Sequence, residues 1–435
     1  MLPLVDEKPE PPGRAGPRFA RPTRPASPPS PRTAAGLLAV LTLGATTLLV
    51  VAGPDGTRQD CRPLSVTGWR ADEAVTGEFA RYGDDNSRLD DWTGGDGSRS
   101  VRLPDGRTLW LSADTFLDRV HPVGTRGSRP VWVRNAGLVM SPDGRLERTL
   151  LGDGPGALFR GPATADGREV WRWPADAVVE PRAPGSGEQV VRVLLWQRAA
   201  AMGEWVFGVP RATEVATLSL PELEVESVET VVPPSRTDPS RRVLYGTSAV
   251  RSGGWTYVFG ADERTAGGSS AAHVARVPTG RLADAGAWRH WDGTRWQPDA
   301  ERAAASTVGG APGGPDARGA SNTYTVVRRG GTWLLLTTDA GGPDGRGLSA
   351  VTSYWACSPQ GPWHGPSDVL SPPLPPGGEQ AGAAPYNPQV HPDAPGEGLL
   401  LGYDVNVLEP VAAVHRDVAL YRPRFVRLEL GRRGG

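Results

Sequence analysis

The sequence predicts an all-β domain, a five-bladed β-propeller over residues 65–430, and three observations favour this fold class. Beyond residue 63, no long run shows the 3.6-residue hydrophobic period of a helix. A strand–turn–strand pattern recurs instead, and its copies end roughly 65 to 85 residues apart, a spacing that suits four-stranded blades with long loops. The chain also contains 57 glycines and 44 prolines, which are the residues that end short strands and form turns.

The N-terminal part of the chain has a different composition. Residues 1–33 are rich in Pro, Arg and Ala, so we expect a disordered cytoplasmic tail. Residues 34–53, AAGLLAVLTLGATTLLVVAG, carry no charge, and about 20 such residues cross a bilayer as one helix. Five arginines within residues 14–32 precede this segment, which predicts a single-pass cell-membrane protein whose later residues lie outside the cytoplasm. A cleaved signal peptide and a buried core helix are the alternatives. Residues 54–64 are interpreted as a linker.

Charge and cysteine content exclude some classes of protein. The 435 residues have a net charge of −1 with acids and bases interspersed, which argues against nucleic-acid binding. Cys61 and Cys357 form neither a C-x-x-C motif nor a Cys/His cluster, so a structural zinc site is not expected. Outside the cytoplasm the two cysteines can form one disulfide, although the sequence leaves their pairing open. The sequence also leaves the oligomeric state open.

Four copies of the repeated pattern end in aspartate. They read SVRLPDGRTLWLSAD, AVRSGGWTYVFGAD, VVRRGGTWLLLTTD and QVHPDAPGEGLLLGYD, and they end at Asp114, Asp262, Asp339 and Asp404. A weaker copy, AVVEPRAPGSGEQVVRVLLWQ, ends at Gln197. The second apolar run of each copy is nearly continuous, as in strands that are buried on both faces. Five copies therefore predict five blades, whereas a pair of β-sandwiches, the alternative, would not explain the repeated terminal aspartate.

The acids that flank the first hairpin suggest a reactive site. A hairpin returns the chain to the face that it left, so Asp96 before the first strand and Asp114 after the second should lie on one rim. Asp176, in WRWPADAVV, precedes the first strand of the weaker copy, and we expect it to face Asp96 across the mouth of the channel. Two carboxylates at a concave mouth suit glycoside hydrolysis. The alternative is that these aspartates cap turns, which best suits the aspartates repeated at the ends of the copies.

The phrases GGDGSRSVRLPDGRTLWLSADTFL, WPADAVV, WDGTRW and GPW resemble a family of actinobacterial secreted domains of unknown function, over about residues 65–430. That family is related to five-bladed propeller glycosidases, including arabinanases and sialidase-like folds. The resemblance implies acids at the start of the inner strand in the first three blades, and Asp96 and Asp176 match the first two. In the third blade, Thr247 and Ser248 stand where the general acid, usually a glutamate, would be. Glu263, just after Asp262, is the candidate substitute.

The same resemblance implies that a histidine from a late blade helps to hold a calcium ion or a water molecule in the channel. His391, in YNPQVHP, is the matching candidate, and a hydrogen-bonded core histidine is the alternative. Asn387, from the same phrase, is assigned to substrate binding. Four aspartates are assigned to substrate binding with it: Asp114, Asp262, Asp339 and Asp404.

These patterns together predict a membrane-anchored, extracytoplasmic propeller that binds or acts on carbohydrate, with lipid contacts through one helix. As a glycoside hydrolase it would use Asp96 as base or nucleophile, Asp176 to tune the pKa and orientation, and Glu263 as acid. A non-catalytic propeller that binds a glycan or a cell-surface protein is the first alternative. A structural envelope protein with a plugged channel is the second.

Overall fold

The structure is a computed structural model, and it describes residues 61–432 except 88–90, 118–130, 155, 202–204, 206, 235–237, 264–269, 310–319, 339–349, 408–413 and 415–416. The described residues belong to one unit, Asp55–Gly435. The expected tail (1–33), the expected membrane segment (34–53) and Asp339 lie outside the described residues. Within the described part, no helix is long and apolar enough to cross a membrane.

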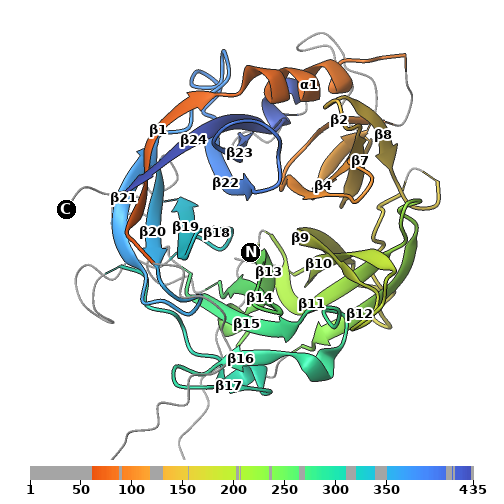
Figure 1. Ribbon diagram of the computed structural model, residues 1–435. Helices are drawn as coiled ribbons and strands as arrows, with labels where there is room; N and C mark the ends of the chain where they lie inside the picture. Colours follow the sequence, from red (N-terminus) through yellow and green to blue (C-terminus); the bar gives the residue numbers. More distant parts are fainter. Residues whose placement is uncertain are drawn as a thin grey trace, which may run out of the picture. The chain divides into compact units, whose positions relative to one another are not determined.

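Five sheets of four or five strands stand around a common centre, which their innermost strands face (Figure 1). From the centre outward, the first is β3 (Arg99–Arg102), β4 (Thr108–Ser112), β7 (Ala136–Met140) and β8 (Leu146–Leu150). The second is β9 (Val170–Pro181), β10 (Gln189–Ala199), β11 (Val209–Leu218) and β12 (Val225–Val232). The third is β13 (Leu244–Ser252), β14 (Trp255–Ala261), β15 (Ala272–Pro278), β16 (Arg289–Trp291) and β17 (Trp296–Gln297).

The two remaining large sheets complete the ring. The fourth is β18 (Thr325–Arg329), β19 (Thr332–Thr338), β20 (Val351–Ala356) and β21 (His364–Leu370). The last is β22 (Ala384–His391), β23 (Leu399–Asn406), β24 (Arg424–Arg432) and β1 (Leu64–Ala71). A small sheet of β2 (Trp92–Gly95), β5 (Thr115–Leu117) and β6 (Val131–Val133) continues three strands of the first sheet after a short break. Four 3-10 helices lie in the connections: η1 (Pro239–Arg241), η2 (Ala285–Ala287), η3 (Ala300–Arg302) and η4 (Val418–Tyr421).

The all-β class predicted from the sequence is confirmed, and the sheets have the arrangement of a propeller. Each repeated copy forms an antiparallel hairpin: β3–β4, β9–β10, β13–β14, β18–β19 and β22–β23. The second strands are apolar because each sheet packs against both of its neighbours, and β4 and β19 are buried along their full length. One cluster, for example, joins Leu111 of the first sheet to Val193 and Leu218 of the second.

The ring is closed by strands from both ends of the domain. β1 pairs with β24, so the last sheet contains the first and last strands of the described chain, and Figure 1 shows the two side by side. The chain between β1 and β2 forms the helix α1 (Glu73–Gly83), which the sequence analysis did not predict. Asp72 caps this helix, because its Oδ1 accepts the Val75 N–H at 3.1 Å while its Oδ2 accepts Arg427 Nε at 2.7 Å.

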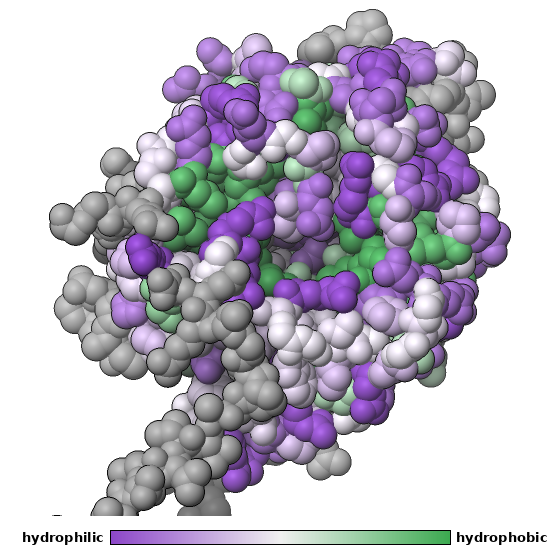
Figure 2. Space-filling view, in the orientation of Figure 1, coloured by the Kyte–Doolittle hydropathy of each residue, from purple (hydrophilic) through white to green (hydrophobic). Residues whose placement is uncertain are grey.

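The inner strands surround a central cavity. Its volume is about 760 Å³. Its lining comes from the inner strands β3, β9, β13, β18 and β22 and from the turns that follow β13, β18 and β22. Figure 2 shows the hollow at the centre of the ring. This volume lies within the range of small-molecule sites.

A disulfide connects the last two sheets. Cys61, just before β1, and Cys357, just after β20, are bonded with their Cα atoms 5.5 Å apart. The Arg62 N–H beside it also donates to Thr332 Oγ1 at 3.1 Å. The entry of the chain into the domain is therefore tied to the fourth sheet as well as to β24.

Replacing Cys61 and Cys357 together by serine should lower the free energy of unfolding by about 2–5 kcal/mol, because the bond restricts the unfolded chain over a long loop. Urea unfolding of the full chain, followed by tryptophan fluorescence, measures the loss. Each single variant should lose as much as the double variant, and a reductant should destabilise only the wild type. Equal stability of the wild type and the double variant would contradict this prediction.

Candidate active site

Asp96 and Asp114 lie where the first sheet is interrupted, Asp96 between β2 and β3 and Asp114 between β4 and β5. The Ala113 N–H donates to the Asp96 carbonyl at 2.7 Å, and the Asp96 N–H donates to the Asp114 carbonyl at 3.2 Å. The hairpin therefore brings both aspartates to one end of its strands. Gly97, in the same break, has a φ of 65°, and a Cβ there would lie 3.0 Å from the Ala113 Cβ, so this turn requires glycine.

Two tyrosines hold the Asp96 carboxylate. The Tyr386 hydroxyl, from β22, donates to Asp96 Oδ2 at 2.6 Å, and the Tyr421 hydroxyl, from η4, also hydrogen-bonds to this carboxylate. Burial raises the pKa of Asp96, whereas the two tyrosines and the Arg99 charge act in the opposite direction. Asp96 therefore keeps a proton to higher pH than a surface aspartate does.

Asp114 accepts hydrogen bonds from the first and second sheets. Trp173 Nε1 donates to Asp114 Oδ1 at 2.9 Å, and Arg134 Nη1 lies 3.5 Å from Oδ2. Although 27% of the side chain is exposed, protein atoms surround the carboxylate densely. Burial and the charge of Asp96 raise the pKa of Asp114 to about 7, against the lowering effect of Arg134. At neutral pH Asp114 therefore exists in both its protonated and its ionised form.

The last sheet supplies the third carboxyl group, Asp404 in β23, which is 2% exposed. The Gly97 N–H donates to Asp404 Oδ2 at 2.6 Å, and Asn387 Nδ2 donates to the same oxygen at 3.1 Å. Burial and the charge of Asp96 raise the pKa of Asp404 to about 7. Asp96, Asp114 and Asp404 thus form one cluster, which we call the acid cluster, with Asn387 beside it.

Arg99 is the buried counter-ion of the acid cluster. Its side chain is 2% exposed, and its Nε donates to the Ala175 carbonyl at 2.5 Å. The guanidinium charge is attracted by Asp176, Asp404 and Asp96, although burial lowers the pKa of Arg99. A buried charge is stable only when opposite charges compensate it, so Arg99 and the acids depend on one another.

Asp176 is placed differently from the sequence-based expectation. It lies inside β9, next to a register shift in the pairing with β10, and not before the strand. Its Oδ1 accepts the Ala177 N–H at 2.8 Å, and its Oδ2 accepts the Ala249 N–H of β13 at 2.6 Å. Burial raises the pKa of Asp176 to about 7. Asp176 therefore lines the central cavity and joins two inner strands, and Arg99 links it electrostatically to the acid cluster.

Glu263 is occupied by an ion pair. Arg198, which is 2% exposed, donates to both oxygens of Glu263 at 2.5 and 2.7 Å. The Arg198 guanidinium carbon also lies 5.3 Å from the centroid of the Trp173 ring. Glu263 is therefore connected to Asp114 only indirectly, through Arg198 and Trp173.

Asp262 has a structural environment. Its side chain is fully buried, and its Oδ1 accepts the Ala271 N–H at 2.8 Å across the segment that follows β14. Its Oδ2 lies 3.6 Å from His273 Nε2. These contacts hold Asp262 within the third sheet.

His391 packs between the first and last sheets. Its Nδ1 is 2.8 Å from Ser100 Oγ, and its ring centroid is 4.7 Å from that of Trp110. Burial lowers the pKa of His391 to about 3. Across the described part of the chain, no group of three or more His, Cys, Asp or Glu residues is placed to hold a metal ion. The environment is that of the core histidine considered as the alternative.

Sequence reasoning did not identify five residues that complete the site: Arg99, Arg134, Trp173, Tyr386 and Tyr421. Arg99 stands three positions after Asp96, but one arginine is not distinctive in a chain this rich in arginine. Trp132, which is 46% exposed, lies next to Arg134, whose guanidinium carbon is 4.5 Å from the indole centroid. An exposed indole near carboxyl groups is a surface on which a sugar ring can stack.

Asp404→Asn should gain stability relative to the wild type as the pH rises from about 4 to about 7. The pKa of Asp404 in the folded state, about 7, exceeds its ordinary value of 3.8. Between these two values the folded wild type binds more protons than the unfolded chain, so its stability falls as the pH rises. The relative gain should be about 2–4 kcal/mol, measured by urea unfolding across this pH range.

The matched control for Asp404→Asn is Asp292→Asn. The backbone N–H groups of Arg295 and Thr294 hold the pKa of Asp292 at about 2, so its titration lies below this range. The stability difference between Asp292→Asn and the wild type should therefore stay constant with pH. A constant difference for Asp404→Asn would show that its carboxyl group ionises normally.

Residues 79–430 match a family described as a domain of unknown function, DUF5005, whereas no curated protein matches the chain. A protein from Bacteroides ovatus ATCC 8483 that is described as a putative hydrolase has a similar structure. The two chains are 17% identical, the TM-score is 0.58, and the match covers 82% of this chain and 89% of that one. A GH43_1 enzyme from Xanthomonas citri, complexed with xylotriose, has 14% identity and a TM-score of 0.43, over 82% and 92% of the two chains. An arabinanase from Bacillus subtilis has 10% identity and a TM-score of 0.41, over 77% and 94%.

The Bacteroides ovatus likeness shows a shared fold over most of both chains. The family match begins within α1 and ends within β24, so it includes the acid cluster, Arg99 and the central cavity. The chain belongs to the family of the domain of unknown function DUF5005.

Proposed function

We propose that this protein is a membrane-anchored, extracytoplasmic five-bladed propeller that hydrolyses glycosidic bonds at the acid cluster. The anchor is the uncharged segment 34–53, and the five blades are the five large sheets, with the small sheet as an extension of the first. Secretion and an actinobacterial origin follow from the resemblance of its sequence phrases. The observation that carries the proposal is the pair Asp96 and Asp114, whose backbones are hydrogen-bonded across one hairpin break and whose carboxyl groups both have raised pKa values.

Asp114 is the better candidate for the general acid. A group with a pKa of about 7 is protonated in a large fraction of molecules at neutral pH and can give its proton to a leaving oxygen. Glu263, the acid expected from the sequence, has both oxygens bound by Arg198. We therefore assign the acid to Asp114 and leave the base or nucleophile at Asp96. Burial raises the pKa of Asp96, and the hydrogen bonds from Tyr386 and Tyr421 stabilise its ionised form against that effect.

The aromatic side chains near Asp114 suit a carbohydrate. Trp173 is half-buried and donates its indole N–H to Asp114, and Trp132 is 46% exposed. Flat indole faces pack against the C–H faces of sugar rings. Arg134, which pairs with Glu169 and lies 3.5 Å from Asp114, holds its guanidinium group 4.5 Å from the Trp132 ring centroid. The site therefore combines a surface for the sugar ring with a proton donor.

A non-catalytic glycan-binding propeller is the second candidate function. Two of the acids expected to be catalytic favour this function, because they already accept hydrogen bonds within the protein. Glu263 accepts from Arg198, and Asp176 accepts from two backbone N–H groups. In this alternative the acid cluster serves to join the first and last sheets, and the aromatic surface alone binds sugar.

Asp114→Asn and Asp96→Asn should each lower kcat/KM for glycoside hydrolysis by about 10²–10⁴-fold, because each removes one partner of the acid–base pair. Release of reducing sugar from a panel of pentose and hexose polysaccharides by the full chain measures the activity. Asp105→Asn is the matched control, since Asp105 lies in the turn at the opposite end of the same hairpin and should leave the rate unchanged. Glycan binding that survives Asp96→Asn, without any hydrolysis by the wild type, would favour the second function.

Arg134→Gln should move the alkaline limb of the kcat/KM profile to higher pH. A general acid works only while protonated, so activity should fall above the Asp114 pKa of about 7. The Arg134 charge lowers that pKa, so its removal should extend activity into more alkaline solution. Arg295→Gln, an exposed change beside Asp292, is the control and should not move the limb. An NMR titration of the Asp114 carboxyl carbon checks the same shift without substrate, and an unchanged pKa would exclude this electrostatic role of Arg134.

A further inference from the structure

Three arginines stand at the same position of the repeated pattern, and the candidate active site uses none of them. The copies SVRLPDGRTLWLSAD, AVRSGGWTYVFGAD and VVRRGGTWLLLTTD each contain a Val-Arg pair just before the turn. The arginines of these pairs are Arg102, Arg251 and Arg328, each within the last two residues of β3, β13 and β18. The two other copies have Glu180 and His391 at this position. The repeat therefore brings three guanidinium groups to one end of the inner strands.

These arginines line the end of the central cavity that lies farther from the acid cluster. Arg102, Arg251, Arg328 and the adjacent Arg329 all line this cavity, whose volume is about 760 Å³. The acid cluster lies where the inner strands begin, because Asp96 precedes β3, whereas the arginines lie where the inner strands end. Among the described residues that line the cavity, none belongs to the acid cluster. This end of the cavity is therefore distinct from the candidate active site.

The three repeated arginines do not share a protein partner. Arg251 Nη1 donates to the Val179 carbonyl of the second sheet at 2.9 Å. The Arg328 guanidinium carbon lies 5.8 Å from the centroid of the Trp333 ring in its own sheet. The Arg102 side chain has neither a hydrogen bond nor an ion pair within the described residues. What the three positions have in common is the cavity, so a role that all three arginines share must lie there.

Positive charge exceeds negative charge around this end of the cavity. Two acids, Asp176 and Asp393, are among the residues that line the cavity. Both oxygens of Asp176 already accept backbone N–H groups, at 2.8 and 2.6 Å. Asp393, on the turn after β22, is exposed and stands with the arginines. The four arginines around one opening repel one another unless an anionic group compensates their charges.

Main-chain carbonyl groups hold two of the guanidinium groups in place. The Val179 carbonyl accepts from Arg251, and the Pro392 carbonyl of the last sheet accepts from Arg329 Nη2 at 3.1 Å. A guanidinium group has five N–H donors, so each of these arginines keeps donors for a ligand. Because their positions are already fixed, they lose little freedom when they pair with a phosphate or carboxylate group.

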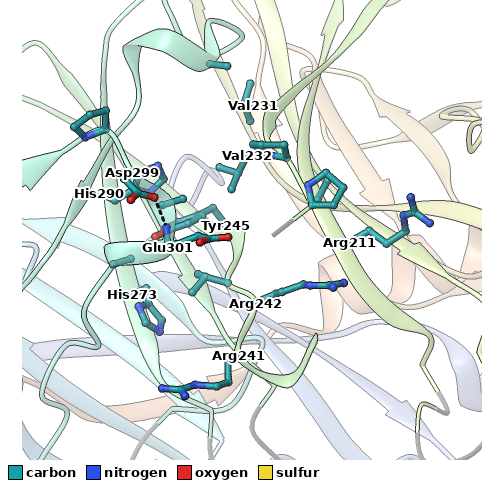
Figure 3. A pocket seen from close by; sticks show the side chains of 18 residues that line it. Arg211, Val231, Val232, Arg241, Arg242, Tyr245, His273, His290, Asp299 and Glu301 are labelled. Atoms are coloured by element: carbon teal, nitrogen blue, oxygen red, sulfur yellow. Dashed lines mark hydrogen bonds between the residues drawn. The ribbon is translucent and has the colours of Figure 1, made fainter. Parts of the chain in front are cut away.

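A second cavity, between the second and third sheets, has a different arrangement of charges. Its volume is about 470 Å³, and it shares no lining residue with the central cavity. Figure 3 shows arginines and acids together around it: Arg211, Arg241, Arg242, Asp299 and Glu301. None of these arginines belongs to a repeated Val-Arg pair, so the exposed Arg241 provides a control for the loss of one charge.

We infer that the end of the central cavity at the turns after β13, β18 and β22 binds a molecule with two or more phosphate or carboxylate groups. The arginines pair with these groups, and a second anionic group lets one molecule reach arginines of more than one sheet. A volume of about 760 Å³ lies within the range of small-molecule sites. The inference goes beyond the proposed function and does not depend on it, because no residue of the acid cluster takes part.

Calorimetric titration of the full chain in detergent tests the inference. The probes are tripolyphosphate and citrate, and the controls are inorganic phosphate, for a single anionic group, and D-glucose, for an uncharged molecule. At least one probe should bind about tenfold or more tightly than inorganic phosphate, and the tighter probe identifies the anionic group. Added NaCl should weaken this binding, because salt screens charges. Asp96→Asn should leave the binding unchanged, so that failure of this site and failure of the proposed hydrolysis remain distinguishable.

Three variants test the assigned contacts, and Arg241→Gln is their matched control. Arg102→Gln should weaken binding of the tighter probe by about fivefold or more while the melting temperature stays the same, because this side chain has no hydrogen bond to lose within the described residues. Arg251→Gln should weaken binding by about tenfold. Asp393→Asn should strengthen binding, since it removes a negative charge beside the arginines. Arg241→Gln should leave binding unchanged.

Four results would overturn the inference. They are the absence of tripolyphosphate and citrate binding below about 10 mM, equally tight binding of inorganic phosphate, binding that both Arg102→Gln and Arg251→Gln leave unchanged, and an equal loss in Arg241→Gln and Arg102→Gln.

Discussion

The pairing of β1 with β24 is the constraint on which the candidate active site depends. It places a strand from the start of the domain in the last sheet, and this closure sets the last sheet beside the first. The Gly97 N–H then reaches Asp404 Oδ2 at 2.6 Å, although the two residues are 307 positions apart, and the Tyr386 hydroxyl reaches Asp96. Opening the ring at this point would separate Asp404 and Tyr386 from Asp96. Closure of the ring of sheets therefore also assembles the acid cluster.

The charge balance inside the ring explains why the acids hold protons at neutral pH. Arg99 supplies one permanent positive charge, because a guanidinium group does not lose its proton in a protein. Asp96, Asp176 and Asp404 all compete for that charge in a buried setting. Ionising all of them would leave negative charges without compensation, so the pKa values of these carboxyl groups rise. The arrangement costs stability as the pH rises from about 4 to about 7, and it also provides the proton donor that acid–base chemistry requires.

The sequence predicted the part of the structure that depends on local periodicity. The five hairpins follow from apolar runs separated by glycine-rich turns, and the geometry of a hairpin is sufficient to bring Asp96 to Asp114. The helix α1 was missed because its stability comes from packing, where Phe79 lies 5.1 Å from the ring of Trp110. Tyr386 could not be assigned either, since its contact with Asp96 spans 290 residues and depends on ring closure. Local patterns therefore located the acids but not the residues that set their pKa values.

The third sheet explains why the site is built from the first and last sheets. Thr247 and Ser248 occupy the position in β13 where the resemblance places an acid, and both are buried. The Thr247 hydroxyl donates to the Tyr324 carbonyl at 2.6 Å, and the Ser248 hydroxyl donates to the Val326 carbonyl at 2.9 Å. These bonds join β13 to the fourth sheet, and Ser248 Oγ also accepts the Val326 N–H at 3.1 Å. An ionised carboxylate at position 247 would face the Tyr324 carbonyl oxygen, to which it could not donate. The third sheet therefore uses hydroxyl groups at these two positions to join its neighbour, and the carboxyl group that the hairpin break brings to Asp96 is that of Asp114, which is hydrogen-bonded to Trp173.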